Sequence, residues 1–204
     1  MIDLVVASRN RGKLAEFSDV LAPLGFRVAG IGPDAVEPEE TGTTLEENAL
    51  IKAQDGARVL RAGCVADDSG LFVDALEGRP GVFSARYAGA GASDADNRKK
   101  LLQEMLPLVP EERAAEFRAV ICAIVPELWP TPRYFAGVVR GRIALAERGS
   151  AGFGYDSLFV PDEGDGRTFA EMGPREKNAI SHRGRALAAM VAAISAARGV
   201  PPQL

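Results

Sequence analysis

A strand, a polar turn and an amphipathic helix follow one another at the start of the chain, and this order constrains the fold most. Residues 2–7 are a nearly continuous apolar run, which is typical of a strand buried on both faces. Residues 8–13 read Ser-Arg-Asn-Arg-Gly-Lys, and Leu14, Phe17 and Leu21 follow at helical spacing. This start predicts an α/β protein.

The rest of the chain continues to alternate between predicted strands and helices, without repeats, low-complexity segments or flexible linkers. We therefore expect one α/β domain over residues 1–204, with a mixed central sheet flanked by helices. The predicted strands are 26–31, 64–66 with a continuation at 71–76, 117–125, 133–145 and 156–160; the predicted helices are 45–60, 93–106 and 181–198. Thr43 or Thr44 caps the helix over 45–60, and Gly199 ends the last helix.

Composition excludes several classes of function. The chain has 24 basic and 28 acidic residues, giving a net charge of −4, which argues against a nucleic-acid partner bound without regard to sequence. Two cysteines argue against a disulfide framework and favour a reducing compartment. The N-terminal sequence resembles neither a signal peptide nor a membrane span, so we expect a cytoplasmic protein without a membrane partner.

The turn over residues 8–13 is a candidate phosphate site. Free backbone N–H groups at a helix start, together with Ser8, Asn10 and the Lys13 ammonium, suit a polyphosphate. It is not a Walker motif, because Ala7 and Leu14 stand where that motif requires Gly and Ser or Thr. The alternative is an ordinary capped turn.

Carboxylates form a second candidate site. Asp67 and Asp68 are expected at the end of a strand, where their mutual repulsion favours a bound cation, and Mg²⁺ prefers such ligands. The acidic loop over 37–42 adds weight only if it faces this pair. The alternatives are an Asx-turn at the strand end and acidic side chains that are simply solvated.

A third set of residues suits a planar base. Residues 152–156 read Gly-Phe-Gly-Tyr-Asp, in which the aromatic ring can stack on a base and Asp156 can accept ring N–H groups. Lys177, His182 and Arg183 lie near the start of the last predicted helix, where they can donate to an anion or a carbonyl. A lone histidine can equally be a structural residue.

Six motifs follow one another along the chain: Ser-x-Asn-x-x-Lys, Glu-Glu-Thr-Gly-x-Thr-x-x-Glu-Asn-Ala, Asp-Asp-Ser-Gly-Leu, Pro-Gly-x-x-Ser-Ala-Arg-Tyr, Gly-Phe-Gly-Tyr-Asp and Ser-His-Arg-Gly-x-Ala-Leu. Together, over residues 2 to about 195, they resemble the inosine triphosphate pyrophosphatase family. The resemblance implies a homodimeric, Mg²⁺-dependent α/β enzyme with two lobes around a deep active-site cleft. It implies hydrolysis of ITP, dITP and XTP to the monophosphate and pyrophosphate.

The resemblance also implies a role for each matching residue. Asp68 would be the general base that activates a Mg-bound water, and Glu39 with Asp68 would hold Mg²⁺, although Glu40 is an alternative to Glu39. The triphosphate would contact Ser8, Arg9, Asn10, Arg11, Gly12 and Lys13, with Lys52 and Ser69 nearby, and the base and ribose would contact Phe153, Gly154, Tyr155, Asp156, Lys177, His182 and Arg183. The rival hypotheses are a pyrophosphatase for other damaged nucleotides and a nucleotide-binding module without turnover.

Overall fold

The computed structural model describes residues 2–32, 35–36 and 38–199, which form two compact units. Among these residues, unit 1 contains 2–68, 119–137 and 183–199, and unit 2 contains 69–118 and 138–182. Within the described part of the chain, no helix is both long and apolar enough to cross a membrane. The single domain and the cleft expected from the sequence stay predictions.

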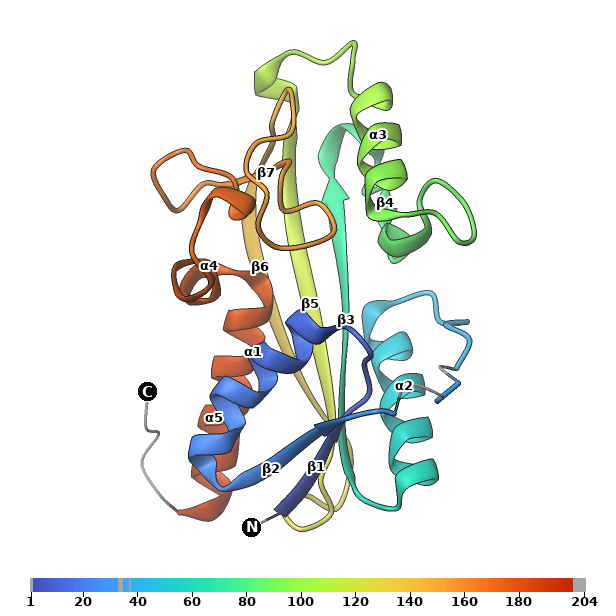
Figure 1. Ribbon diagram of the computed structural model, residues 1–204, viewed down its shortest axis with the longest axis vertical. Coiled ribbons are helices and arrows are strands. Elements are labelled where there is room, and N and C mark those ends of the chain that lie inside the picture. Colours follow the sequence, from blue (N-terminus) through green and yellow to red (C-terminus); the bar gives the residue numbers. More distant parts are fainter. Residues whose placement is uncertain (1, 33–34, 37, 200–204) are drawn as a thin grey trace. The chain divides into compact units, whose positions relative to one another are not determined.

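The described strands form a mixed seven-stranded sheet in the order β2-β1-β3-β5-β6-β7, with β4 paired to β3 (Figure 1). β1 runs parallel to β2 and β3, whereas β4 and β7 are antiparallel to β3 and β6. The α/β class with a mixed sheet flanked by helices is thereby confirmed. The strands are β1 Ile2–Val6, β2 Phe26–Gly30, β3 Gly63–Val73, β4 Pro80–Gly81, β5 Ala114–Ile124, β6 Arg133–Ile143 and β7 Phe159–Pro161; the helices are α1 Arg11–Leu21, α2 Leu45–Leu60, α3 Asp94–Glu104, α4 Pro174–Ile180 and α5 His182–Arg198.

Side-chain caps explain where three of the helices begin. The Asn10 side chain accepts hydrogen bonds from the first N–H groups of α1. Thr44 and Glu47 form a capping box at α2, as the sequence predicts, and Ser93 forms another at α3 with Asp96. Each cap satisfies N–H groups that have no partner within the helix.

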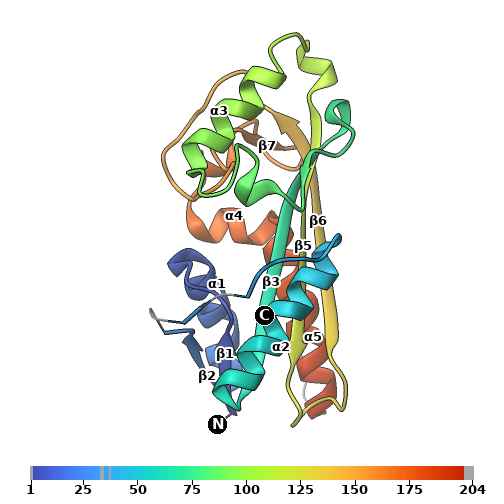
Figure 2. The same ribbon diagram turned by 90° about the vertical axis from the view of Figure 1, so that its right-hand side faces the viewer.

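The core of unit 1 lies between α1, α5 and one face of the strands. Val65 of β3, Phe17 of α1 and Met190 of α5 belong to one buried apolar cluster. The other face is covered by α2 (Figure 2). A Cβ added to Gly56 of this helix would lie 2.5 Å from Cys64 Sγ. This glycine therefore lets α2 approach β3 closely.

The core of unit 2 is aromatic. Phe117 of β5 packs 4.7 Å from Phe159 and 6.2 Å from Phe169, measured between ring centroids. Leu101 and Met105 at the end of α3 complete the same buried cluster. This cluster anchors the segment that leads from β6 to α4, which carries several of the predicted site residues.

Two strand boundaries predicted from the sequence are wrong, and one helix was missed. β3 is one strand from Gly63 to Val73, so Asp67 and Asp68 lie inside it and not at its end. The strand predicted over 156–160 is β7, Phe159–Pro161. The short helix α4 was not predicted, because its seven residues lie between Gly173 and Ser181 without a long apolar stripe.

Candidate active site

Asp67 is the centre of a buried ion-pair network in unit 1. Its carboxylate lies 3.0 Å from Lys13 Nζ of α1 and 2.9 Å from Arg183 Nε of α5. Arg183 Nη1 in turn lies 2.9 Å from Glu16 Oε2. Burial alone would raise the pKa of Asp67, but Lys13 and Arg183 outweigh it and hold this pKa well below its usual range. Asp67 is therefore a fixed anion.

Asp68 has different partners, because successive side chains of a strand point to opposite faces. Lys52 Nζ of α2 lies 2.7 Å from Asp68 Oδ1, and Asn48 Nδ2 donates to Oδ2 at 3.3 Å. Burial raises the pKa of Asp68 despite Lys52. A buried carboxylate whose pKa is raised is suited to accept a proton.

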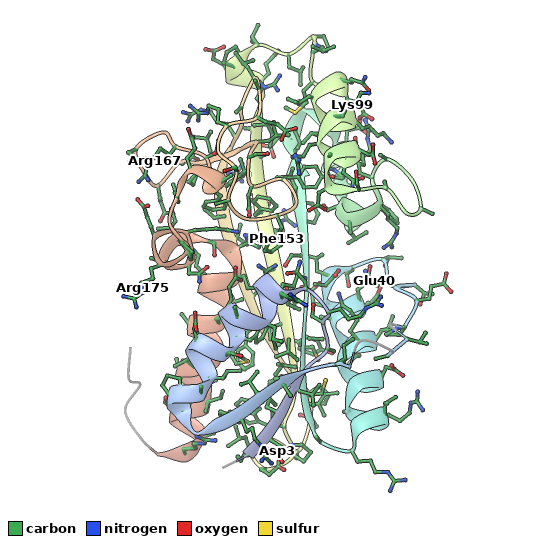
Figure 3. All side chains as sticks on the ribbon, in the orientation of Figure 1. Asp3, Glu40, Lys99, Phe153, Arg167 and Arg175 are labelled. Atoms are coloured by element: carbon green, nitrogen blue, oxygen red, sulfur yellow. The ribbon has the colours of Figure 1, made fainter. Side chains whose placement is uncertain are left out.

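The acidic segment before α2 contributes Glu40 to this cluster. Figure 3 labels Glu40. Its Oε1 lies 2.9 Å from Lys52 Nζ, which also contacts Asp68, so one ammonium group joins two carboxylates. Glu39, the predicted metal ligand, is exposed. Asn48 fixes the segment by accepting the N–H of Gly42 at 2.8 Å.

The carboxylates of this cluster suit a divalent cation. Lys13, Lys52 and Arg183 contact four of them, namely Glu16, Glu40, Asp67 and Asp68. Within the described residues, no group of three or more His, Cys, Asp or Glu side chains forms a metal cage. Mg²⁺ does not require one, since one or two carboxylates and the substrate phosphates commonly hold it.

The predicted phosphate turn is a capped helix start. Asn10 Oδ1 accepts from Gly12 N and Lys13 N at 2.9 and 3.1 Å, and Ser8 Oγ accepts from Asn10 N at 3.1 Å. Arg9 and Arg11 are exposed. The residues therefore form the capped turn that was the alternative to a phosphate site. The same turn also places Lys13 beside Asp67.

In unit 2, Asp156 organises the glycine-rich turn that precedes it. Its Oδ2 accepts from Phe153 N at 2.9 Å and from Lys177 Nζ at 2.7 Å. The Lys177 ammonium lies 4.8 Å from the centroid of the Phe153 ring. A Cβ on Gly152, whose φ is +77°, would lie 2.1 Å from Asp156 Oδ2, so this position requires glycine.

The remaining predicted residues are distributed over both units. Tyr155 is buried and donates its hydroxyl to Ser84 O at 2.9 Å. His182 is buried and stacks on Phe117 with centroids 4.6 Å apart, which is the structural role weighed above. Arg183 belongs to the network of unit 1, and Ser69 is half-buried in β3.

Glu16, Asn48, Asp94 and Arg98 were not among the predicted site residues. The sequence does predict that Asn48 and Lys52, four residues apart, share a helix face, and the spacing of Lys13 and Glu16 could have indicated Glu16 in the same way. Asp94 and Arg98 contact the 152–156 turn through side chains, and no local sequence signal announces such contacts.

Comparisons with known proteins agree with the six motifs. The Ham1 family model matches residues 4–193. A dITP/XTP pyrophosphatase from Geobacter sulfurreducens is 50% identical over 191 residues, covering 92% of this chain and 94% of its own length. Another, from Symbiobacterium thermophilum, is 48% identical over 185 residues, covering 91% of each chain. The solved structure of a HAM1 protein from Coxiella burnetii has a TM-score of 0.82 at 44% identity and covers 92% of this chain and 95% of its own.

These matches confirm the family resemblance that the motifs predict. The matches extend over nearly the full length of this chain and of each relative, and they are found both in sequence and in structure. The chain belongs to the Ham1 family.

Proposed function

We propose that this protein hydrolyses non-canonical purine nucleoside triphosphates, namely ITP, dITP and XTP, to the monophosphate and pyrophosphate. The observation that carries the proposal is the near-full-length identity of 48–50% to relatives named dITP/XTP pyrophosphatase. The buried Asp68, in contact with Lys52 and Asn48, supplies a group suited to the chemistry.

In the proposed reaction, a water oxygen bonds to the α-phosphorus and the bond from that phosphorus to the bridging oxygen breaks. Asp68 accepts the proton of the water, since its carboxylate is disfavoured by burial. Lys13 and Lys52 supply positive charge for the phosphates. Asp67 fixes the Lys13 ammonium by its ion pair.

Mg²⁺ is the proposed cofactor, held by Asp68 and Glu39. Glu40 already pairs with Lys52, whereas the neighbouring Glu39 is exposed and can turn toward a cation. The carboxylate oxygens of the cluster are donors that fit this ion. When bound, it neutralises charge on the phosphates.

In unit 2, the Phe153 ring is proposed to stack on the purine, and Asp156 and Lys177 fix the backbone around it. The predicted donation from His182 and Arg183 to a carbonyl of the base stays a prediction.

A homodimer in the cytoplasm is also proposed. Phe83 is 55% exposed in the segment over 82–92, which suits a surface covered by a second copy. Cys64 and Cys122 are buried free thiols, in keeping with a reducing compartment. Light scattering tests the dimer, since a mass of 21.6 kDa at micromolar concentration would mean a monomer.

The deciding experiment is pyrophosphate release from dITP, XTP, ITP, dATP and dGTP with Mg²⁺. We expect turnover of the first three, little of the last two, and a loss of at least about 100-fold in the Asp68→Asn variant. Inosine diphosphate and orthophosphate as primary products would refute the proposed bond cleavage. Binding of ITP without any turnover would instead support the rival hypothesis that the protein is a nucleotide-binding module.

A further inference from the structure

Helix α3 holds the backbone of the Phe153 turn at a single residue, Gly154. Gly154 N donates to Asp94 Oδ2 at 2.7 Å, and Arg98 Nη1 donates to Gly154 O at 2.9 Å. Asp94 and Arg98 lie one helical turn apart, so they share a face of α3. Both polar backbone groups of Gly154 are therefore bonded to side chains of one helix.

Arg98 is itself fixed by a second contact. Its Nε lies 2.8 Å from Glu147 Oε2, which also accepts the Ser157 hydroxyl at 3.0 Å. The guanidinium group is planar, and contacts on two of its edges determine its orientation. With a side chain only 19% exposed, Arg98 joins α3 to both ends of the segment over 154–157.

Phe153 lies between two such backbone anchors. On one side, its own N–H is bonded to Asp156; on the other, the next residue is held by Asp94 and Arg98. Gly154 adopts a φ of +59°, so its conformation is one that few other residues would maintain. The direction of the Phe153 ring consequently depends on Asp94 and Arg98, whose hydrogen bonds go to the backbone of Gly154 and not to the ring itself.

The same residues line a cavity of about 200 Å³ in unit 2. Asp94, Arg98 and Glu147 lie on its wall together with Phe153 and Asp156. The cavity next to the Phe153 ring is thus bounded by the residues that hold the backbone of the turn. A shift of the turn would change both the shape of this cavity and the direction of the ring.

We infer that Asp94 and Arg98 are positioning residues that orient the Phe153 ring for stacking on the purine base. The inference rests on the proposed function and deepens it, because it assigns base affinity to side chains that act through Gly154. Small displacements of a positioned group lower the affinity or rate of an enzyme, and here the displaced group would be the Phe153 ring on which the base stacks.

The test compares the wild type with Arg98→Met, Arg98→Lys, Asp94→Asn and the matched control Lys99→Met. Lys99 follows Arg98 on α3 and is exposed, so its loss removes a cation from the same helix (Figure 3). Three measurements are made: amide exchange of the 152–157 segment in the ligand-free protein, calorimetric binding of inosine monophosphate, and kcat and KM for dITP.

We expect faster amide exchange of this segment, about tenfold weaker binding of inosine monophosphate and a similar rise in KM for Arg98→Met, with kcat within about threefold of wild type. Arg98→Lys and Asp94→Asn should show an intermediate pattern, since the asparagine oxygen can still accept from Gly154 N, and Lys99→Met should show none. Unchanged exchange and KM in Arg98→Met, or a fall in kcat without a change in KM, would overturn the inference. A wild type that releases no pyrophosphate refutes the proposed function instead, and the exchange comparison still decides whether α3 holds the turn.

Discussion

Asp67 and Asp68 are adjacent, yet replacing each by asparagine should have different consequences. Asp67→Asn should lower the stability of the fold, whereas Asp68→Asn should abolish activity. Asp67→Asn keeps the shape of the side chain but removes the charge that balances Lys13 and Arg183. Arg183 keeps Glu16 as a partner, whereas the contacts of this network leave Lys13 without a carboxylate. A buried cation that loses its partner is strongly destabilising.

The magnitude follows from the burial of the pair. The Asp67 side chain is 1% exposed, and breaking an ion pair at such a site costs about 3–5 kcal/mol of unfolding free energy. For a chain of this length that loss lowers the melting temperature by roughly 6–20 °C. Asp68→Asn should cost less than about 1 kcal/mol, because Lys52 keeps Glu40 as its partner.

Urea unfolding at pH 7 measures both free energies, and pyrophosphate release measures both activities. Asp68→Asn should remain folded and inactive, while Asp67→Asn should lose stability without a change in m-value. The double variant Lys13→Met/Asp67→Asn should recover at least about 1 kcal/mol relative to the sum of the single variants. Equal destabilisation by the two asparagines, or no coupling to Lys13, would refute this description of the network.

Three further predictions concern the metal, a thiol and the glycine-rich turn. Glu39→Gln should raise the Mg²⁺ concentration for half-maximal rate at least about tenfold, and Glu40→Gln should raise it less; the reverse order would assign the metal to Glu40. Burial raises the pKa of Cys64 to about 12, so above pH 9 this thiol ionises first in the unfolded chain, and its contribution lowers stability by about 1.4 kcal/mol per pH unit up to that pKa. Cys64→Ala should reduce the slope of alkaline unfolding curves by this amount, while Cys122, whose pKa burial also raises, keeps its own contribution. Gly152→Ala should lower kcat/KM for dITP about 100-fold by displacing Asp156, and wild-type kinetics would contradict the close contact.

Caps and apolar spacing in the sequence predicted helices α2 and α5 well, because these helices are determined by residues close together in the chain. A cap at Thr43 or Thr44 and the apolar spacing of residues 45–60 predict α2 at its observed bounds, and the structure has the cap at Thr44. The start and end of α5 follow from the apolar stripe between His182 and Arg198. Capping and periodicity depend on neighbours within a few residues, so one sequence suffices.

The prediction for β3 was wrong because its cause is not local. Four polar or small residues, 67–70, indicate a strand end, and nothing nearby compensates two charges inside a strand. The compensation comes from Lys13, Lys52 and Arg183, which the fold brings to the strand. For the same reason the motifs suggested the carboxylates of the site, but not which cation each one contacts.

The register of β3 then decides which aspartate is available for chemistry. Its side chains alternate between the face of α1 and α5 and the face of α2, so Asp67 contacts two cations and Asp68 shares one with Glu40. A shift of one residue would exchange these environments. Pairing of Leu4 with Gly63 opposes such a shift, as does Gly70, where a Cβ would lie 2.4 Å from Gly81 O. Substituting Gly70 with alanine should therefore impair turnover through Asp68, even though Gly70 itself carries no reactive group.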